Sequence, residues 1–424
     1  MTKWSIDLAR KQVHNFDNLN SDEQEYLVDY LNQTFPPDTY ELHRNCRKQA
    51  LENLKTAQTT LEGAQQHFPH CIDSSELEIN YDSLLECGIV LTAGGDGERL
   101  RNSLIAQGVA EESLRDFTKA TCPLPDFYRT CGTLQTTLAV ISDLCARINH
   151  QIPVIITTGP AGSVTSRVIP KIIGDNNNFG LKHIQIISQD ERLHLTQDNK
   201  IAWAMQGDKP LPITHPDETG GPLMKLRARL PGKKESALDW LSERNCKKTI
   251  VLQGTALYDP KLILHMASAG IHHNAVGAGI LRKSFCESDP FGTFVVVEKN
   301  DRSRLIIIEQ EIRNAATFSL KDPSGSWFLP FNTGLYVFSL DLLAQHSLPD
   351  YATPPKQVLP ELERSPKIGY AATDLLPFAA DPAVLTISSD SFGVLKTADD
   401  LQKLSDLGKK FELHKICEKV ENPA

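Results

Sequence analysis

Three closely spaced glycines, followed by two arginines, form the part of the sequence best suited to chemistry. They come directly after the apolar segment Ile89–Leu91, which is typical of a buried parallel strand. The glycines are Gly94, Gly95 and Gly97. Glycine adopts positive φ easily and leaves no Cβ between the backbone and a ligand, and successive free N–H groups in such a loop form a concave binding site for anions. We therefore predict a phosphate-binding loop; a tight strand-to-helix turn is the alternative.

Two further features of this segment favour a multiply charged phosphate. A helix that begins near Asp96–Glu98 would direct the partial positive charge of its N-terminus at the loop. The guanidinium of Arg99 can pair with two phosphate oxygens at once. A dinucleotide fingerprint needs a glycine three residues after Gly97, and a P-loop needs Gly-Lys followed by Ser or Thr. Both are absent, so this loop is neither of the two common phosphate-binding types.

The composition is that of an ordinary globular protein with excess negative charge. The 424 residues exceed the usual size of one domain, so two or three domains are expected. The formal net charge of −9 argues against nonspecific binding to nucleic acid or acidic membranes. Nine cysteines without a Cys-x-x-Cys pair, and no apolar signal core or membrane-length apolar run, predict a reduced, cytoplasmic protein. We expect a monomer or a weak oligomer.

The first 80 residues are predicted to be helical and structural. Ser21 with Gln24 fits a capping box, and Asp38 to about Gln66 fits a long, partly solvated helix. This region carries no phosphate or metal signature. The expected division is an N-terminal helical segment (1–80), a catalytic core (81–345) and a small C-terminal α/β domain (346–424).

From residue 85 onward, strands and helices alternate. Strands are expected at Ile89–Leu91, Pro153–Thr158, Ile184–Ser188 and Thr249–Leu252, and helices at Thr133–Asn149, Val164–Ile173 and Pro260–Ala269. This alternation predicts a mixed, mostly parallel sheet with helices on both faces. Ligands bind at the carboxyl ends of the strands in such sheets. The loops after Leu91, Ser188 and Leu252 are therefore the predicted binding positions.

Three later segments complete the expected order of elements. A β-hairpin is predicted over residues 291–309, with its turn at Lys299–Arg304. A further strand region is expected at Trp327–Ser339, and a helix beginning near Thr397 follows the last loop.

Several segments between residues 88 and 400 resemble, in order, the motifs of one family. The earlier ones are Leu91–Leu100 (A-G-G-x-G-x-R-L), Thr118-Lys119-Ala120 with Pro123 and Pro125 (Pro-Lys-Gly), and Phe179–Leu181 with Ile187–Gln189 (F-G-L…F-x-Q). The later ones are Pro216–Gly221 (P-x-G-x-G-G), Asp289–Glu309 (Pro-x-Gly leading to V-V-E-Y), Asn332, and Phe392–Lys396 (F-x-P-[VI]-K). Together they resemble the eukaryotic-type UDP-sugar pyrophosphorylase family, closest to its UDP-N-acetylhexosamine pyrophosphorylase branch.

The resemblance implies a Rossmann-like nucleotide-diphospho-sugar transferase fold and a uridylyltransferase activity. UTP and a sugar 1-phosphate, most simply N-acetylglucosamine 1-phosphate, would give a UDP-sugar and pyrophosphate, with Mg²⁺ as cofactor. A phosphate oxygen of the sugar phosphate attacks the α-phosphorus of UTP in line. Because both reactants are anionic, catalysis must come mainly from positioning and charge neutralisation.

The resemblance also implies a role for each candidate residue. Arg99 would hold the departing β- and γ-phosphates, Lys119 would neutralise the α-phosphate, and Lys396 would hold the sugar phosphate. The nucleotide-binding residues would be the three loop glycines with Gln189, Gly220 and Gly221, and the sugar-binding residues Glu309, Asn332 and Gly292. The alternatives are solvated surface charges for the lysines and plain turns for the glycines.

The sequence departs from the family pattern at several positions. These are the acids Asp96 and Glu98 where neutral residues are usual, Arg101 and Ala120 in place of glycines, and Gln253-Gly254-Thr255 after the strand Thr249–Leu252. The family follows this strand with an acid that anchors Mg²⁺, so the metal ligands of this chain are unknown. Mg²⁺ is then held mainly by UTP phosphates and another acid, or activity is weak or lost.

Three other functions compete with this interpretation. A UTP–glucose-1-phosphate uridylyltransferase differs only in the sugar pocket around Glu309 and Asn332. A non-catalytic nucleotide-binding homologue would explain the missing acid. A scaffold that uses only the N-terminal helices would explain none of the later motifs.

Overall fold

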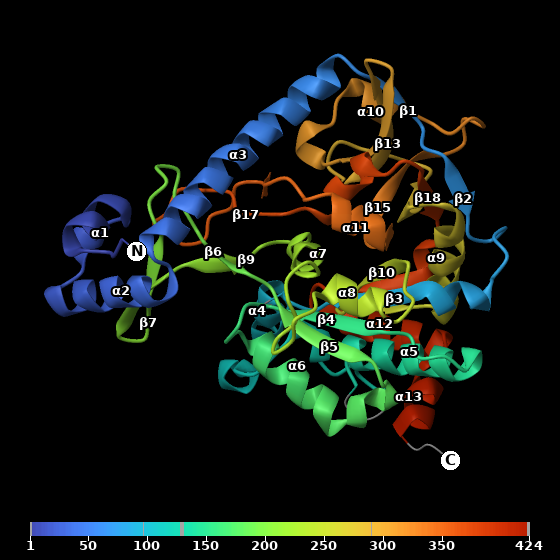
Figure 1. Cartoon of the computed structure of the whole chain (residues 1–424), viewed down its shortest axis with the longest axis horizontal. Coiled ribbons are helices and arrows are strands. Elements are labelled where there is room, and N and C mark those ends of the chain that lie inside the picture. The colour runs from blue at the N-terminus through green and yellow to red at the C-terminus, as the bar shows by residue number, and fades with distance from the viewer. Residues whose placement is uncertain (1, 96, 128–130, 290, 422–424) are drawn as a thin grey trace. The chain divides into compact units, whose positions relative to one another are not determined.

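The fold is described by a computed structural model that covers residues 2–95, 97–127, 131–289 and 291–421 (Figure 1). The chain forms two compact units. The smaller unit comprises Met1–Gly63, Asp190–Gly221 and Leu348–Ala372, and the larger unit comprises Ala64–Gln189, Pro222–Ser347 and Thr373–Ala424. This division differs from the expected three segments, because residues 64–80 belong to the larger unit and residues 190–221 and 348–372 join the N-terminal helices in the smaller one. Leu193, Leu195 and Ile201, for example, bury their side chains in the core formed by these helices.

The larger unit is built on an 11-stranded mixed sheet. The strands of its continuous path are, in spatial order, β2 (Cys71–Asp73), β18 (Pro382–Thr386), β12 (Ala275–Arg282), β15 (Phe328–Ser339), β10 (Lys248–Gln253), β3 (Cys87–Thr92), β4 (Val154–Thr158) and β5 (Ile184–Ser188). β10, β3, β4 and β5 are parallel and lie side by side in Figure 1. β15 is antiparallel to both of its neighbours on this path. The predicted mixed, mostly parallel sheet is therefore confirmed.

Shorter strands and nine helices complete the larger unit as far as the structure describes it. The strands are β1 (Gln65–His67), the hairpin β13 (Thr293–Lys299) and β14 (Arg302–Ile308), and the pair β11 (Ala256–Tyr258) and β19 (Phe392–Val394). The helices are α4 (Glu98–Ala106), α5 (Thr133–Ile148), α6 (Val164–Asp175), α8 (Ala237–Ser242), α9 (Pro260–His272), α10 (Ala315–Ser319), α11 (Leu340–Gln345), α12 (Asp399–Lys410) and α13 (Leu413–Glu421). α7 (Gly221–Lys225) joins the two units in sequence.

Strand β3 is buried on both of its faces, which explains its continuous apolar sequence. Ile89 packs in the core that includes Leu134 of α5. Gly88 points to the opposite face, where an added Cβ would lie only 2.6 Å from Cδ2 of Leu241 in α8. Helices on both faces thus hold the carboxyl end of β3, and the glycine loop that follows it, in a fixed place.

Most predicted elements agree with the structure to within three residues. The strand at Ile184–Ser188 is β5, the hairpin is β13–β14, and the helix expected near Thr397 begins at Asp399. The expectation that residues 1–80 are helical is wrong at its end, because β1 and β2 belong to the sheet of the larger unit.

The smaller unit holds three N-terminal helices and three two-stranded ladders. The helices are α1 (Ile6–Gln12), α2 (Ser21–Thr34) and α3 (Pro37–Glu62), and the ladders are β6 (Glu191–Leu193) with β9 (Thr214–Pro216), β7 (Trp203–Gln206) with β8 (Lys209–Pro212), and β16 (Tyr351–Ala352) with β17 (Ile368–Gly369). The capping box of α2 is formed by Asn20 and Glu23 rather than by Ser21 and Gln24. Glu23 accepts the N–H of Asn20, whereas the amide of Gln24 donates to the carbonyl of Leu19.

Three histidines are buried in the smaller unit: His43, His194 and His215. Burial lowers the pKa of His43 and of His194 to about 4 and that of His215 to about 3, and neighbouring cations add to the effect. Nε2 of His194 lies 2.6 Å from the Ser365 hydroxyl. These rings are therefore neutral parts of the core at neutral pH.

All nine cysteines lie among the described residues, and none of them forms a disulfide bond. None of the helices described is both long and apolar enough to cross a membrane.

Candidate active site

The glycine loop leads from the end of β3 into α4, which begins at Glu98 as predicted. Gly97 caps this helix with φ +69°, in the left-handed region that favours glycine. A Cβ on Gly97 would lie 3.0 Å from Cβ of Lys119. The positive φ and the close approach together explain the glycine, and they place the start of α4 against Lys119. Asp96 lies outside the described residues.

Gln189 lies against Gly94. A Cβ on Gly94 would be 3.0 Å from the Cδ, Oε1 and Nε2 atoms of this amide, so the glycine is needed for the contact. Gln189 follows β5 and is 8% exposed, and its backbone N–H donates to Thr158 O at 3.1 Å. Gly95 has open space around it. The structure thus brings Gln189, a predicted nucleotide-binding residue, to the predicted loop and leaves the Gly95 backbone accessible.

Three cations gather beside this loop: Arg99, Lys119 and Lys396. The pKa of Lys119 is lowered to about 8, first by burial and then by the charges of Lys396 and Arg99. The Asp400 carboxylate opposes this shift. Like charges and burial both disfavour the charged amine. A multiply charged anion would reverse that cost, so the cluster is suited to phosphate.

Lys396 is brought to this cluster by pairing between distant segments. β19 pairs with β11, which follows β10 in the chain, and Leu395 N–H donates to Thr255 O at 3.0 Å. The carboxylate of Asp400, in the first turn of α12, accepts the N–H of Lys396 at 3.0 Å and that of Thr397 at 2.9 Å. The backbone of Lys396 is therefore fixed at the carboxyl end of β10.

The three predicted sugar-binding residues also lie together. A Cβ on Gly292 would be 2.9 Å from both carboxylate oxygens of Glu309. Asn332 N–H donates to Gly292 O at 2.7 Å, and its side-chain Oδ1 accepts the Tyr336 hydroxyl at 2.9 Å. Asn332 lies within β15 rather than in a turn. Glu309 directly follows β14 and Asn332 lies in β15. A carboxylate and an amide are groups that can bind hydroxyls.

Gly220 and Gly221 differ from the other predicted residues because they belong to the smaller unit. Gly220 N–H donates to Tyr370 O at 2.7 Å. A Cβ on Gly221 would lie 1.8 Å from Oδ1 of Asp217. Close packing within the smaller unit explains both glycines, which supports the turn interpretation of this segment.

One acid near the site was not predicted from the sequence. The pKa of Asp374 is raised to about 7, chiefly by burial and then by the Glu309 carboxylate. Its local sequence, Ala-Thr-Asp-Leu-Leu, contains no glycine loop or charge pattern that marks it. Only the folded chain places this carboxyl group near Glu309.

The end of β10 does not fit a Mg²⁺ ion held by the protein. Gln253 stands where the family resemblance expects an acid, and its Nε2 donates to Thr333 O at 3.1 Å. A Cβ on Gly334 would lie 2.4 Å from this Nε2, so the amide fills the space. Within the described parts of the chain, three or more histidine, cysteine or acidic side chains nowhere gather as metal ligands.

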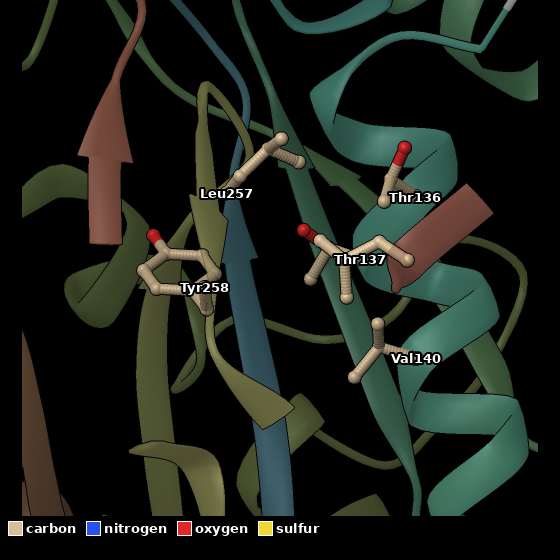
Figure 2. Close-up of a pocket in the computed structure, with 6 residues that line it drawn as sticks. Thr136, Thr137, Val140, Leu257 and Tyr258 are labelled. Carbon is tan, nitrogen blue, oxygen red and sulfur yellow. The ribbon is translucent and has the colours of Figure 1, made fainter. Parts of the chain in front are cut away.

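A small hollow lies between α5 and β11 (Figure 2). Its walls are Thr136, Thr137, Val140, Leu257, Tyr258 and Leu413. It has no room for a water molecule. The Tyr258 hydroxyl accepts Gln253 N–H at 2.8 Å and donates to Gln253 O at 2.9 Å. This hollow is therefore a gap in the packing that supports β10, and not a ligand site.

Solved structures of UDP-sugar pyrophosphorylases resemble this chain along most of its length. Trypanosoma brucei uridine diphosphate N-acetylglucosamine pyrophosphorylase, in complex with an inhibitor, is 13% identical with a TM-score of 0.67, covering 93% of this chain and 80% of that chain. An Entamoeba histolytica protein named as a UDP-N-acetylglucosamine pyrophosphorylase is 17% identical (TM-score 0.60, 80% and 84% covered). UDP-glucose pyrophosphorylase from Leishmania major is 14% identical (TM-score 0.53, 90% and 79% covered). No protein-family model and no curated protein matches the sequence. The chain therefore has the fold of the UDP-sugar pyrophosphorylases.

Proposed function

We propose that this protein is a UTP:sugar-1-phosphate uridylyltransferase of the eukaryotic-type UDP-sugar pyrophosphorylase family. The observation that carries the proposal is the cluster of Arg99, Lys119 and Lys396 beside a glycine loop, within a fold shared with these enzymes. The lowered pKa of Lys119 supports it, because burial and the two neighbouring cations disfavour its charge and a bound phosphate would offset both effects.

In the proposed reaction a sugar-phosphate oxygen forms a bond to the α-phosphorus of UTP. The bond from that phosphorus to the oxygen bridging to the β-phosphorus breaks, and the electron pair leaves with pyrophosphate. Lys396 holds the incoming phosphate, Lys119 neutralises the α-phosphate, and Arg99 holds the leaving group. Charge shifts toward pyrophosphate in the transition state, so fixed cations there stabilise it more than the ground state.

Uracil and the sugar are proposed to bind beside different strands of the sheet. The Gln189 amide, which lies against Gly94, presents a donor and an acceptor to uracil. Glu309 and Asn332 bind sugar hydroxyls. N-acetylglucosamine 1-phosphate is the proposed acceptor and glucose 1-phosphate the alternative, since pyrophosphorylases of both kinds share the fold.

Magnesium is proposed to arrive with UTP, bound by phosphate oxygens. Mg²⁺ commonly keeps several waters and takes few protein ligands at phosphate sites, and the amide at Gln253 offers no charge. When bound, the ion supplies further neutralisation of phosphate charge.

A pyrophosphate-release assay on the full chain tests the proposal. It uses UTP, Mg²⁺ and a panel of sugar 1-phosphates, with Lys119→Met as the site variant and the exposed Lys182→Met as its matched control. We expect release with one acceptor, loss of release in the first variant, and the parent rate in the second.

A non-catalytic nucleotide-binding protein is the second candidate, favoured by the amide at Gln253. Calorimetry with UTP separates the two functions. Binding of UTP without release of pyrophosphate in the presence of any acceptor would favour this candidate, and absence of UTP binding would refute both.

A further inference from the structure

The ammonium of Lys396 lies over an aromatic ring. Its Nζ is 5.0 Å from the ring centroid of Phe291. Phe291 in turn lies beside Phe331, with 4.9 Å between the ring centroids. The Arg282 guanidinium covers Phe331 at 4.8 Å and is itself paired with Asp289. Two partly buried rings therefore carry two cations, of which only Arg282 has a carboxylate partner in the described part of the chain.

The backbone around these rings is fixed by strand pairing. Phe331 is the pairing partner of Thr293 in β13. Each ring is followed directly by a residue of the proposed sugar site, and these two residues are joined by the hydrogen bond from Asn332 N–H to Gly292 O at 2.7 Å. Phe291 therefore connects the proposed sugar-binding strands to the proposed phosphate-binding lysine.

Electrostatics explains why Lys396 needs such a partner. Lys396 belongs to a cluster of cations whose mutual repulsion contributes to the lowered pKa of Lys119. A lysine side chain is flexible and strongly hydrated, so repulsion alone would turn its ammonium toward water. The negative face of an aromatic ring attracts an ammonium and raises the population held over the ring by about two- to thirtyfold. The ring thus opposes the repulsion before any phosphate arrives.

We propose that Phe291 is a positioning residue that holds the ammonium of Lys396 ready for the acceptor phosphate. Phe291 acts through Lys396, and preorganisation of the cation removes the cost of ordering a flexible side chain during binding. The role in turnover rests on the proposed function. The contact between ring and ammonium does not, and it can be tested separately.

The contact is tested by reductive ¹³C-methylation of the lysines and NMR. Dimethyl-lysine keeps its charge, and a methyl group over a ring face is shifted upfield. Other lysines also lie over rings, among them Lys321 over Phe328 at 4.7 Å, so several signals should be shifted upfield. The Lys396 signal is identified as the one that disappears in Lys396→Arg. We expect this signal to be among those shifted upfield, to lose its shift in Phe291→Leu and to keep it in Phe291→Tyr. The matched control is Phe285→Leu, which removes a ring covered by Arg313 rather than by Lys396. A Lys396 signal without upfield shift in the parent, or one unchanged in Phe291→Leu, overturns the proposal.

Steady-state kinetics tests whether the position of the Lys396 ammonium matters for turnover. Phe291→Leu should lower kcat/KM for the sugar 1-phosphate about two- to thirtyfold, leave the KM for UTP unchanged, and be rescued by Phe291→Tyr. Phe285→Leu should behave like the parent. Parent kinetics in Phe291→Leu would overturn the positioning role. A parent protein that releases no pyrophosphate would refute the proposed function, while the NMR experiment would still decide the contact.

Discussion

Replacement of Lys119 by methionine should make the unliganded protein more stable while removing its activity. Burial and two neighbouring cations lower the pKa of this lysine from 10.5 to about 8. A shift of about 2.5 pKa units corresponds to about 3 kcal/mol, and solvent screening makes this an upper limit. Methionine keeps the apolar stem and removes the charge. We therefore expect the free energy of unfolding at pH 7 to rise by about 1–3 kcal/mol in Lys119→Met.

The pH dependence of this effect has a definite sign. The unfolded chain keeps the lysine protonated up to about pH 10.5, and the folded chain only up to about pH 8. The unfolded state thus binds more protons between these values, so the parent becomes more stable as pH rises through this interval. The advantage of Lys119→Met should be full below pH 8 and should vanish near pH 10.5. Urea unfolding of the parent and of Lys119→Met at pH 7 and at pH 10 measures this difference in stability.

Proton uptake on UTP binding gives an independent measurement. At pH 8.5 the free amine is about one quarter protonated, and a bound phosphate raises its pKa, so UTP binding should take up about 0.7 proton. At pH 7 the same calculation gives about 0.1 proton. Calorimetry in buffers of different ionisation enthalpy reports these numbers, and Lys119→Met should show no uptake at pH 8.5.

An ordinary surface lysine at position 119 would give different rates and a different stability after its replacement. Turnover in Lys119→Met and in Arg99→Ala should fall by on the order of a hundredfold or more. A surface charge would change stability by no more than about 0.5 kcal/mol, as we expect for Lys182→Met. If Lys119→Met has the stability, proton uptake and rate of the parent, the cation cluster is not a phosphate site.

Four further outcomes follow from the geometry. Lys396→Ala should weaken use of the sugar 1-phosphate more than UTP binding by calorimetry, and unchanged sugar-phosphate affinity and turnover would contradict this. The three buried histidines of the smaller unit become charged only below their lowered pKa values, so the unfolded state binds more protons than the folded state between about pH 6.5 and 4. As the pH falls through this interval, the free energy of unfolding should therefore decrease by up to about 3 kcal/mol per ring. Urea unfolding at pH 7 and pH 4, with hydrogen exchange to locate the loss, tests this, and equal midpoints would rule it out. Burial raises the pKa of Asp374 from 3.8 to about 7, so the folded state binds more protons between these values and stability falls as pH rises from 3.8 to about 7. Asp374→Asn should therefore be more stable than the parent at pH 8 by about 1 kcal/mol or more in urea unfolding, and equal stability would exclude the shift. Gln253→Asp should bind Mn²⁺ in the presence of UTP about tenfold more tightly than the parent does, because ligand charge raises affinity for hard cations. Electron paramagnetic resonance measures this affinity, and no gain would mean that this position does not face the metal.

The parts of the site that could be predicted from the sequence have local signals. The glycine loop follows an apolar strand and precedes a helix, so its three elements identify one another within a few residues. The strand and helix boundaries around it were predictable for the same reason. Local signals fail where two of them compete at adjacent positions. Asn20 with Glu23 and Ser21 with Gln24 have the same spacing, and the pair that contains the Glu23 carboxylate forms the capping box.

Other parts of the site depend on contacts between distant segments, which spacing alone does not reveal. Lys396 reaches Lys119 only because β19 pairs with β11, and the resemblance to a family was needed to name it. Asp374 is notable only because folding places it near Glu309. The same holds for the two units, because a short apolar segment such as Leu193–Leu195 does not show which core it will join.

The surroundings of Gln253 are built for an amide, and this bears on how the chain would neutralise phosphate charge. The Gln253 side chain donates to a backbone carbonyl of β15, whereas a carboxylate in its place would face that carbonyl oxygen without a proton to share. An acid at this position would therefore need a cation beside it, and the amide does not. We infer that this chain relies more heavily on its own cations than on a metal held by the protein. That inference agrees with the surroundings of Lys119, where burial and then the charges of Lys396 and Arg99 lower the pKa of the amine, a cost that a bound anion would offset.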